Sequence, residues 1–456
     1  MAIKQLDAVQ AMEEITGGKV VTASLSEVQG AWLALLDAEA GRVLACAYKG
    51  ECAFAGLFAK KDSGKVKDIT VDVMELNPNN AAVVRRYVKW TAPQAQNGKG
   101  ISVAFSDWLG AAAAYAAPQF KLRQARPVLV DYAAANADVL KRNFLEAVDT
   151  ATWGVLELGY KEGYGANAAG LTTEEEIVKA LLYGYSMIGF DCSDKIDTKI
   201  ESMSADEVAA KYNELPEEFR EAMKGSYLEA NFKAGDTVVH FEPEQLQRIV
   251  LEFGEAIMHT QYIYNTYLKN TPWDIDFELK LAKADKLMTP QELYLISNEL
   301  QRNGIKMASM ELDGAQAAAD PEGMKVYGEI AATFGYRLSL LNADLYAKEL
   351  GALAKAFKGQ ACFKTGNLLW LAALNIVKAQ DEALLKEMQS FAELPDFTGM
   401  QILTADEANR AWALAYKKLL NPEAGFAAKV KAVLAANGAA YRAEVENAAA
   451  AVLKEL

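Results

Sequence analysis

Residues 185–191 read YSMIGFD, a short and mostly apolar run that ends in an acidic residue. Continuous apolar runs of this length are typical of strands that are buried on both faces of a parallel sheet. We interpret this run and six similar ones as strands. The other six are Ile101–Phe105, Pro127–Asp131, Trp273–Leu281, Ile305–Met310, Tyr336–Leu341 and Ala361–Thr365.

Helix-start signals lie between these runs. Thr289 is followed by Pro290 and, three positions on, by Glu292, which is the spacing of a capping box. The same spacing recurs after Thr172, Ser204 and Thr404. Alternating strands and capped helices predict an α/β fold, either a (β/α) barrel or a doubly wound sheet. Seven candidate strands are one fewer than a closed barrel needs.

The first 95 residues are interpreted as a separate, small mixed α/β segment. Two β-like runs, Lys19–Thr22 and Arg42–Tyr48, are bounded by glycines, and a helix-like stretch follows Asn77. We place the domain boundary at residues 95–96. Residues 96–456 are predicted to form the barrel-like domain, with a helical C-terminal extension beyond residue 404.

The composition of the chain limits its possible binding partners and its cellular location. The chain has 456 residues and a formal net charge of −14, which disfavours nucleic acid and anionic membranes as partners. It contains no run of 18 apolar residues and no signal-like N-terminus, so we expect neither a membrane span nor secretion. Four cysteines without CxxC spacing indicate reduced thiols and a cytoplasmic location. Homo-oligomerisation is left open.

Polar residues directly follow the run at 185–191. Asp191, Asp194 and Lys195 would lie at the carboxyl end of a strand, where functional groups of parallel α/β sheets gather. Two carboxylates and a lysine there can do acid/base work or bind a polar substrate. The alternative is a helix cap, because Asp and Ser often accept bonds from free backbone N–H groups.

Two other strands carry charged residues of interest. Residues 273–281 alternate strictly, so that Asp276, Glu278 and Lys280 share one face with Asp274. Such a face is functional inside a barrel, but the alternation alone favours a strand that faces solvent. Lys364 ends another strand and is a candidate for holding a carboxylate or phosphate, the alternative being an exposed loop lysine.

The two histidines, His240 and His259, receive no site role. His259 lies within a helical pattern from Glu242 to Leu268 and is interpreted as a packed helix residue. Zinc and iron centres usually recruit several histidines, so this shortage argues against such a centre.

Three stretches of the chain resemble the tagaturonate epimerase family. The resemblance is carried by residues 149–155 with 159–166, by Asp191–Asp194, and by residues 255–259, 276–278 and 289–290, and it spans about residues 100–420. It implies a TIM-barrel-like catalytic region. It also implies a metal-dependent epimerase that acts at C4 of an open-chain ketohexuronate and interconverts tagaturonate and fructuronate.

Some positions depart from the family's pattern. Asp194 stands where the family has a base, and Lys364 and Thr365 are kept. Lys195 and Leu341, however, stand where the family has histidines suited to a metal, and Lys283 stands in place of a glutamate suited to the acid role. Protonated lysine and leucine are not metal ligands. We therefore expect no metal site and no other cofactor.

The sequence thus predicts a diverged member of the family that binds a sugar acid or ketose and carries out C4 epimerisation in an altered form. The predicted catalytic residues are Asp194 and Lys283. The predicted substrate-binding residues are Asp191, Lys195, Glu278, Lys364 and Thr365. One alternative is a catalytically inactive homologue that serves binding or assembly. Another is a metal-free lyase or aldolase-like enzyme, in which burial lowers the pKa of Lys283 or Lys195 so that it forms a Schiff base.

Overall fold

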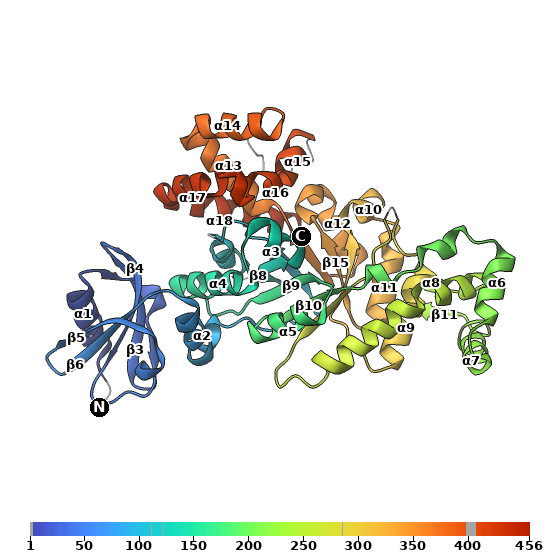
Figure 1. Ribbon diagram of the computed structural model, residues 1–456, viewed down its shortest axis with the longest axis horizontal. Helices are drawn as coiled ribbons and strands as arrows, with labels where there is room; N and C mark the ends of the chain where they lie inside the picture. Colours follow the sequence, from blue (N-terminus) through green and yellow to red (C-terminus); the bar gives the residue numbers. More distant parts are fainter. Residues whose placement is uncertain (1–2, 111, 122, 285, 398–406) are drawn as a thin grey trace.

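Eight parallel strands close into a barrel at the centre of the molecule (Figure 1). The computed structural model describes residues 3–110, 112–121, 123–284, 286–397 and 407–456. Strand β16 pairs with β7 and so closes the sheet, which confirms the barrel and rejects the doubly wound alternative. The barrel strands are β7 (Ile101–Phe105), β8 (Ala125–Ala133), β9 (Gly165–Leu171), β10 (Met187–Asp191), β13 (Asp276–Lys280), β14 (Ser309–Asp313), β15 (Arg337–Leu341) and β16 (Ala361–Thr365).

Strand β9 is the one that the apolar runs did not predict. Its sequence, GANAAGL, consists mostly of glycine, alanine and asparagine, which have low strand propensity. Small side chains are nevertheless required in this part of the barrel. A Cβ added to Gly189 on the neighbouring β10 would lie 3.1 Å from Ala169 Cα and 3.2 Å from Glu278 Oε1. The glycine and alanine residues therefore make room for charged side chains inside the barrel.

The charged face of residues 273–281 points into the barrel. The prediction that this face is exposed to solvent was therefore wrong. Asp276 and Glu278 are buried, whereas Asp274 precedes the strand and is exposed. The strand predicted at 305–310 is also displaced, because β14 begins at Ser309. Both errors have one cause: the inward residues of this barrel are polar, so its strands alternate instead of being apolar throughout.

Helices surround the barrel and begin near the predicted caps. Thr289 and Ser204 cap α9 and α6 with complete capping boxes. The cap of α5 is Thr173 with Glu176, one residue later than predicted, and Thr404 lies outside the described residues. The helices that follow barrel strands are α3 (Ala134–Leu140), α4 (Phe144–Leu158), α5 (Glu174–Leu182), α8 (Pro243–Ile263), α9 (Pro290–Arg302), α10 (Gly314–Ala319), α11 (Met324–Phe334) and α12 (Leu350–Ala356).

An antiparallel sheet precedes the barrel, with the strand order β1-β3-β4-β6-β5 and β2 beside β3. Helix α1 covers one face, and the other packs against α2 and against Leu156 of α4. The sheet ends at Met74 and the barrel begins at Ile101, and the division at residues 95–96 stays a prediction. The elements are α1 (Gln5–Thr16), β1 (Lys19–Val20), β2 (Ser26–Val28), β3 (Ala31–Ala38), β4 (Gly41–Tyr48), β5 (Lys60–Val66), β6 (Ile69–Met74) and α2 (Pro78–Tyr87).

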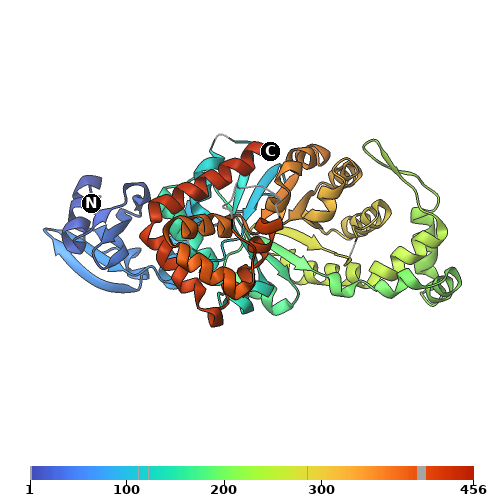
Figure 2. The same cartoon turned by 90° about the horizontal axis from the view of Figure 1, so that it is seen from above.

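Two further groups of elements complete the molecule. An insertion between β10 and α8 projects from the barrel at the end opposite the N-terminal sheet (Figure 2). It contains α6 (Ala205–Asn213), α7 (Glu217–Tyr227), β11 (Phe232–Ala234) and β12 (Thr237–Val239). After β16 the chain is helical, as predicted for the tail: α13 (Leu368–Gln380), α14 (Glu382–Ala392), α15 (Glu407–Leu414), α16 (Tyr416–Leu419), α17 (Phe426–Ala436) and α18 (Gly438–Glu455). Among the described helices, none has the length and apolar character needed to cross a membrane.

Candidate functional site

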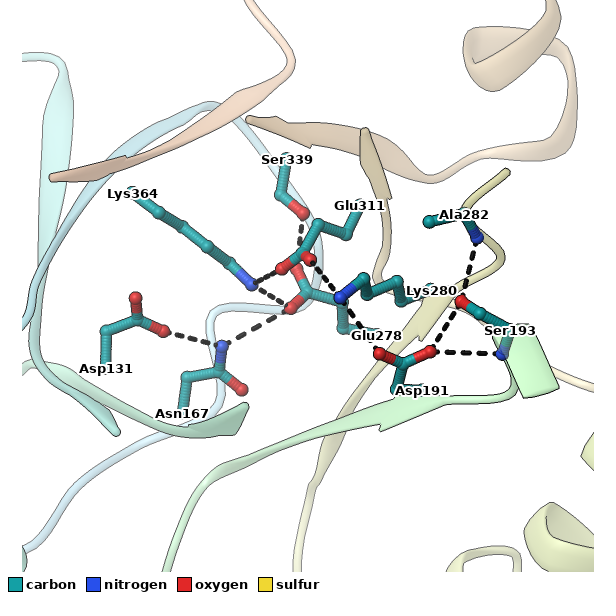
Figure 3. A network of polar contacts seen from close by, with 10 residues as sticks. All are labelled: Asp131, Asn167, Asp191, Ser193, Glu278, Lys280, Ala282, Glu311, Ser339 and Lys364. Atoms are coloured by element: carbon teal, nitrogen blue, oxygen red, sulfur yellow. Dashed lines mark hydrogen bonds and ion pairs between the residues drawn. The ribbon is translucent and has the colours of Figure 1, made fainter. Parts of the chain in front are cut away.

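Charged side chains from several barrel strands meet inside the barrel, near the carboxyl ends of the strands (Figure 3). Four carboxylates face two ammonium groups, so this interior network is net negative. Its members are Asp131 on β8, Asn167 on β9, Asp191 on β10, Glu278 and Lys280 on β13, Glu311 on β14, Ser339 on β15 and Lys364 on β16.

Lys364 is the central cation of the interior network. Its side chain is fully buried, and Nζ donates hydrogen bonds to Glu278 Oε1 and Glu311 Oε2. Burial opposes the charge on Lys364, but the two carboxylates outweigh that effect and hold its pKa well above the usual value. Lys364 therefore stays protonated and forms ion pairs with both glutamates.

Glu278 is stabilised as a carboxylate by side chains from β14, β15 and β9. Ser309 donates a hydrogen bond of 2.9 Å to Oε2, and Ser339 donates to the same oxygen. Asn167 donates to Oε1 at 3.3 Å. Burial alone would raise the pKa of Glu278, but the charge of Lys364 and these bonds lower it below its ordinary value.

A second ion pair lies nearer the strand ends. Lys280 Nζ lies 2.9 Å from Asp191 Oδ2 and 3.8 Å from Glu311 Oε1, which links both pairs into one network. Ser193 donates its hydroxyl and its backbone N–H to Asp191 Oδ1. Asp191 therefore accepts hydrogen bonds from the following turn, as in the cap considered from the sequence, and also forms the ion pair with Lys280.

Asp131 differs from the other acids of the network because no lysine in the described part of the chain forms an ion pair with it. Asn167 donates a hydrogen bond of 2.9 Å to Oδ1, and the Ser106 hydroxyl lies 3.5 Å from Oδ2. Burial raises the pKa of Asp131 to about 6, although Lys364 opposes the shift. This carboxyl group can therefore exchange a proton near neutral pH. A cavity of about 290 Å³ reaches Asp131 from the side of the N-terminal sheet.

The structure brings together only part of the predicted set. Asp191, Glu278 and Lys364 belong to the interior network, and buried Thr365 donates its hydroxyl to the carbonyl of Ala104. Asp194 and Lys195 lie on the short 3-10 turn η5 (Ser193–Lys195) outside the network. The Asp194 side chain is 70% exposed and lies 3.7 Å from Lys195 Nζ. The catalytic role of Asp194 and the binding role of Lys195 stay predictions.

Lys283 lies beyond the end of β13 and among three glutamates. Nζ lies 2.7 Å from Glu252 Oε1, 2.7 Å from Glu292 Oε1 and 3.0 Å from Glu201 Oε1. Its side chain is buried and also contacts the ring of Phe253. We call Lys283, Glu201, Glu252 and Glu292 the Lys283 cluster. It ties the insertion to α8 and α9.

The Schiff-base alternative needs a lysine with a lowered pKa, and neither candidate has one. Burial opposes the charge on Lys283, but its three glutamates outweigh burial and raise its pKa. The charges of Asp194 and Glu255 likewise raise the pKa of Lys195. Both amines stay protonated, so neither is suited to act as the nucleophile.

Glu252 should make stability depend on pH. Burial raises its pKa to about 7, while Lys283 opposes the shift. A carboxyl whose folded-state pKa is raised contributes stability below its unfolded-state pKa, and this contribution is lost as pH rises through the folded-state value. In the wild type, we expect this group to lower the free energy of unfolding by about 1–3 kcal/mol between pH 5 and pH 8. Glu252→Gln should abolish this decrease. Urea unfolding at the two pH values measures it.

Glu255→Gln provides the control on the same helix, since the Glu255 side chain is 68% exposed. Its unfolding curve should shift with pH in parallel with that of the wild type. A Glu252→Gln protein with the same pH dependence as the wild type would contradict the assignment.

Sequence reasoning missed Asp131, Asn167 and Glu311 as members of the site, and Lys280 was noted only for its alternation. Asp131 was visible as the last residue of a predicted strand, which is the position that picked out Asp191. Glu311 was hidden because the predicted strand stopped at Met310. Asn167 was hidden because β9 was not predicted.

The comparisons with known proteins agree with this architecture. The sequence profile of the family UxaE, tagaturonate epimerase, matches residues 21–398. The chain belongs to the tagaturonate epimerase family. This match includes most of the N-terminal sheet, so the expected limit near residue 100 was wrong. A tagaturonate/fructuronate epimerase from Thermotoga maritima is 26% identical over 386 residues, which cover 82% of this chain and 78% of the relative.

Solved structures give the fold of the tagaturonate epimerase family. The native crystal structure of the fructuronate-tagaturonate epimerase UxaE from Cohnella laeviribosi has a TM-score of 0.86 and 24% sequence identity, over 99% of each chain. A structure of the same enzyme complexed with one glycerol has a TM-score of 0.85 over the same share. The two-part architecture of a sheet followed by a barrel is therefore a shared fold.

The divalent metal implied by the family resemblance does not fit the donors in the described part of the chain. There, no three or more His, Cys, Asp and Glu side chains are grouped so that they could hold a metal ion. Three of the four carboxylates of the interior network, those of Glu278, Glu311 and Asp191, form ion pairs with Lys364 and Lys280. Lys195 and Leu341 occupy positions expected to carry ligands and supply none.

Proposed function

We propose that this protein binds a ketohexuronate at the carboxyl ends of the barrel strands and epimerises it at C4, as a diverged member of the tagaturonate epimerase family. The interior network carries the proposal: it gathers carboxylates and two ammonium groups inside the barrel together with Asp131, a carboxyl group whose pKa is raised by burial to about 6. The names of the Thermotoga and Cohnella relatives support the substrate class.

The network has the groups that such a substrate needs. Carboxylates accept hydrogen bonds from sugar hydroxyls, and an ammonium group stabilises negative charge that develops on a substrate oxygen. Lys280 is half-buried near the strand ends and takes this role, in place of Lys195 and Lys283. Asp131 takes up and returns the proton, because a group with a pKa near the working pH is the most effective acid/base catalyst.

A pair of aspartate variants tests this assignment. Asp131→Asn should lower the rate of tagaturonate–fructuronate interconversion by about 10²–10⁴-fold. Asp194→Asn should leave the rate close to that of the wild type, because its carboxylate is largely exposed. Product formation is followed by NMR. The opposite ranking would return the proton-transfer role to Asp194.

The alternative is a catalytically inactive homologue that keeps a binding or assembly role. The observation in its favour is that the charge of Lys364 is fully taken up by Glu278 and Glu311. Calorimetry with tagaturonate, fructuronate and neutral ketoses separates the two functions. If no sugar acid binds the wild-type protein at millimolar concentration, the inactive homologue is the correct description.

A further inference from the structure

A small cavity lies where the barrel meets the C-terminal helices. Its volume is about 100 Å³, and its lining combines the loop after β7, the corner between α3 and α4, and the start of α17. Trp108, in the loop after β7, donates its indole N–H to Gly366 O, the residue after β16, which places the cavity at the strand-carboxyl end of the barrel. Lys141 adopts φ 49° at the end of α3, and Arg142 follows it.

Arg142 is a buried cation without a counterion. Its side chain is only 8% exposed, and no carboxylate among the described residues lies within ion-pair distance of it. Its guanidinium donates to the carbonyls of Asp107 and Glu146 and to the Thr150 hydroxyl, all of which are uncharged acceptors. The Nε–H takes no part in these bonds. Buried charges are normally paired, so this guanidinium lacks an anion.

Two lysines add positive charge to the lining of the cavity. Lys141 and Lys431 line the cavity, and neither forms an ion pair with a described residue; Glu146 is the acid on its wall. Ala427, in the first turn of α17, lines it too, and the N-cap of this helix, Gly425, provides no side-chain hydrogen bond. Free N–H groups and the helix dipole at such an end favour a negative charge. This excess of positive charge occurs in a chain of net charge −14.

We propose that this cavity is a binding site for a small oxyanion, either a phosphate or the carboxylate of a small organic acid, held by Arg142 between Lys141 and Lys431. The volume suits one such group, because a water molecule takes up about 30 Å³ in the liquid. The Nε–H of Arg142, which makes none of the bonds above, is left to donate to the anion, and the ammonium groups of Lys141 and Lys431 add positive charge beside it.

The oxyanion site also bears on the sugar acid, and this extension rests on the proposed function. The interior network is net negative and offers no free cation to a substrate carboxylate. Arg142 lines the small cavity and also the 290 Å³ cavity that reaches Asp131. A ketohexuronate with its carboxylate at Arg142 would extend toward Asp131.

Calorimetric titration with inorganic phosphate tests the site without any sugar. We expect millimolar binding by the wild type, weakened about twofold to fivefold in Lys431→Ala, as for one exposed charge. Arg142→Gln should weaken binding by at least about tenfold. Lys429→Ala is the matched control, because Lys429 lies on the same helix, is exposed and pairs with Glu387. It should bind phosphate like the wild type.

Absence of phosphate binding by the wild type would overturn the site, as would equal affinities of Lys431→Ala and Lys429→Ala. Lys431 is exposed, so its variant keeps the test valid if Arg142→Gln fails to fold. If phosphate and fructuronate compete for binding, the oxyanion that the site binds is the carboxylate of the sugar acid. Phosphate binding without competition identifies a separate phosphate site. If the wild-type protein binds phosphate but does not bind fructuronate, the proposed function is refuted and the oxyanion site is retained.

Discussion

Lys364→Met is expected to lower the free energy of unfolding by about 3–5 kcal/mol at pH 7, since removing one partner of a buried ion pair leaves an uncompensated charge. In this case two carboxylates, those of Glu278 and Glu311, would lose the cation between them. Methionine fills a similar volume, so the loss comes from charge more than from packing. Urea unfolding followed by tryptophan fluorescence measures the change.

The destabilisation by Lys364→Met should shrink as the pH falls from 7 to 5. Without the lysine, burial raises the pKa of Glu278, and a raised pKa contributes stability at low pH that is lost as the pH rises. The control is Lys386→Met, which removes an exposed ion pair with Glu382 and should leave stability unchanged. Equal stability of the Lys364→Met protein and the wild type would show that the interior network does not hold the barrel together.

Lys283→Met should have an effect of similar size, about 3–5 kcal/mol, because Glu252 and Glu292 are buried beside this lysine. The matched control is Lys286→Met. Lys286 contacts the same Glu201 at 2.8 Å, but its side chain is 56% exposed, so its loss should change stability little. Thermal unfolding of the two variants makes the comparison.

The same variant separates a structural lysine from a catalytic one. A structural Lys283 predicts that Lys283→Met loses stability, while the protein that remains folded below its unfolding transition interconverts the epimers at close to the wild-type rate. A catalytic Lys283 predicts that the rate is lost at temperatures where the variant is fully folded. The second result would restore the role assigned to Lys283 from the sequence.

Several features of this protein are determined by the sequence alone, because the interactions behind them are local. Strands such as β7 and β10 are marked by their apolar residues, and the starts of α6 and α9 by side chains that cap the backbone three residues away. Asp191 and Lys364 were selected because each lies at the carboxyl end of a predicted strand, and Glu278 because it lies on the alternating charged face of residues 273–281. The resemblance to the tagaturonate epimerase family was also visible in the sequence.

Other features were decided only by the tertiary structure, because they depend on residues that are distant in the chain. Glu278 and Lys364 are 86 positions apart, and only closure of the barrel shows that the charged face of β13 points inward. Strand β9 has little strand propensity of its own and is fixed by its neighbours β8 and β10. Lys283 and Arg142 show the same dependence. Folding places three carboxylates around Lys283, but no carboxylate of the described residues within ion-pair distance of the buried Arg142 guanidinium. Ion pairing depends on distance in space and not on distance along the chain.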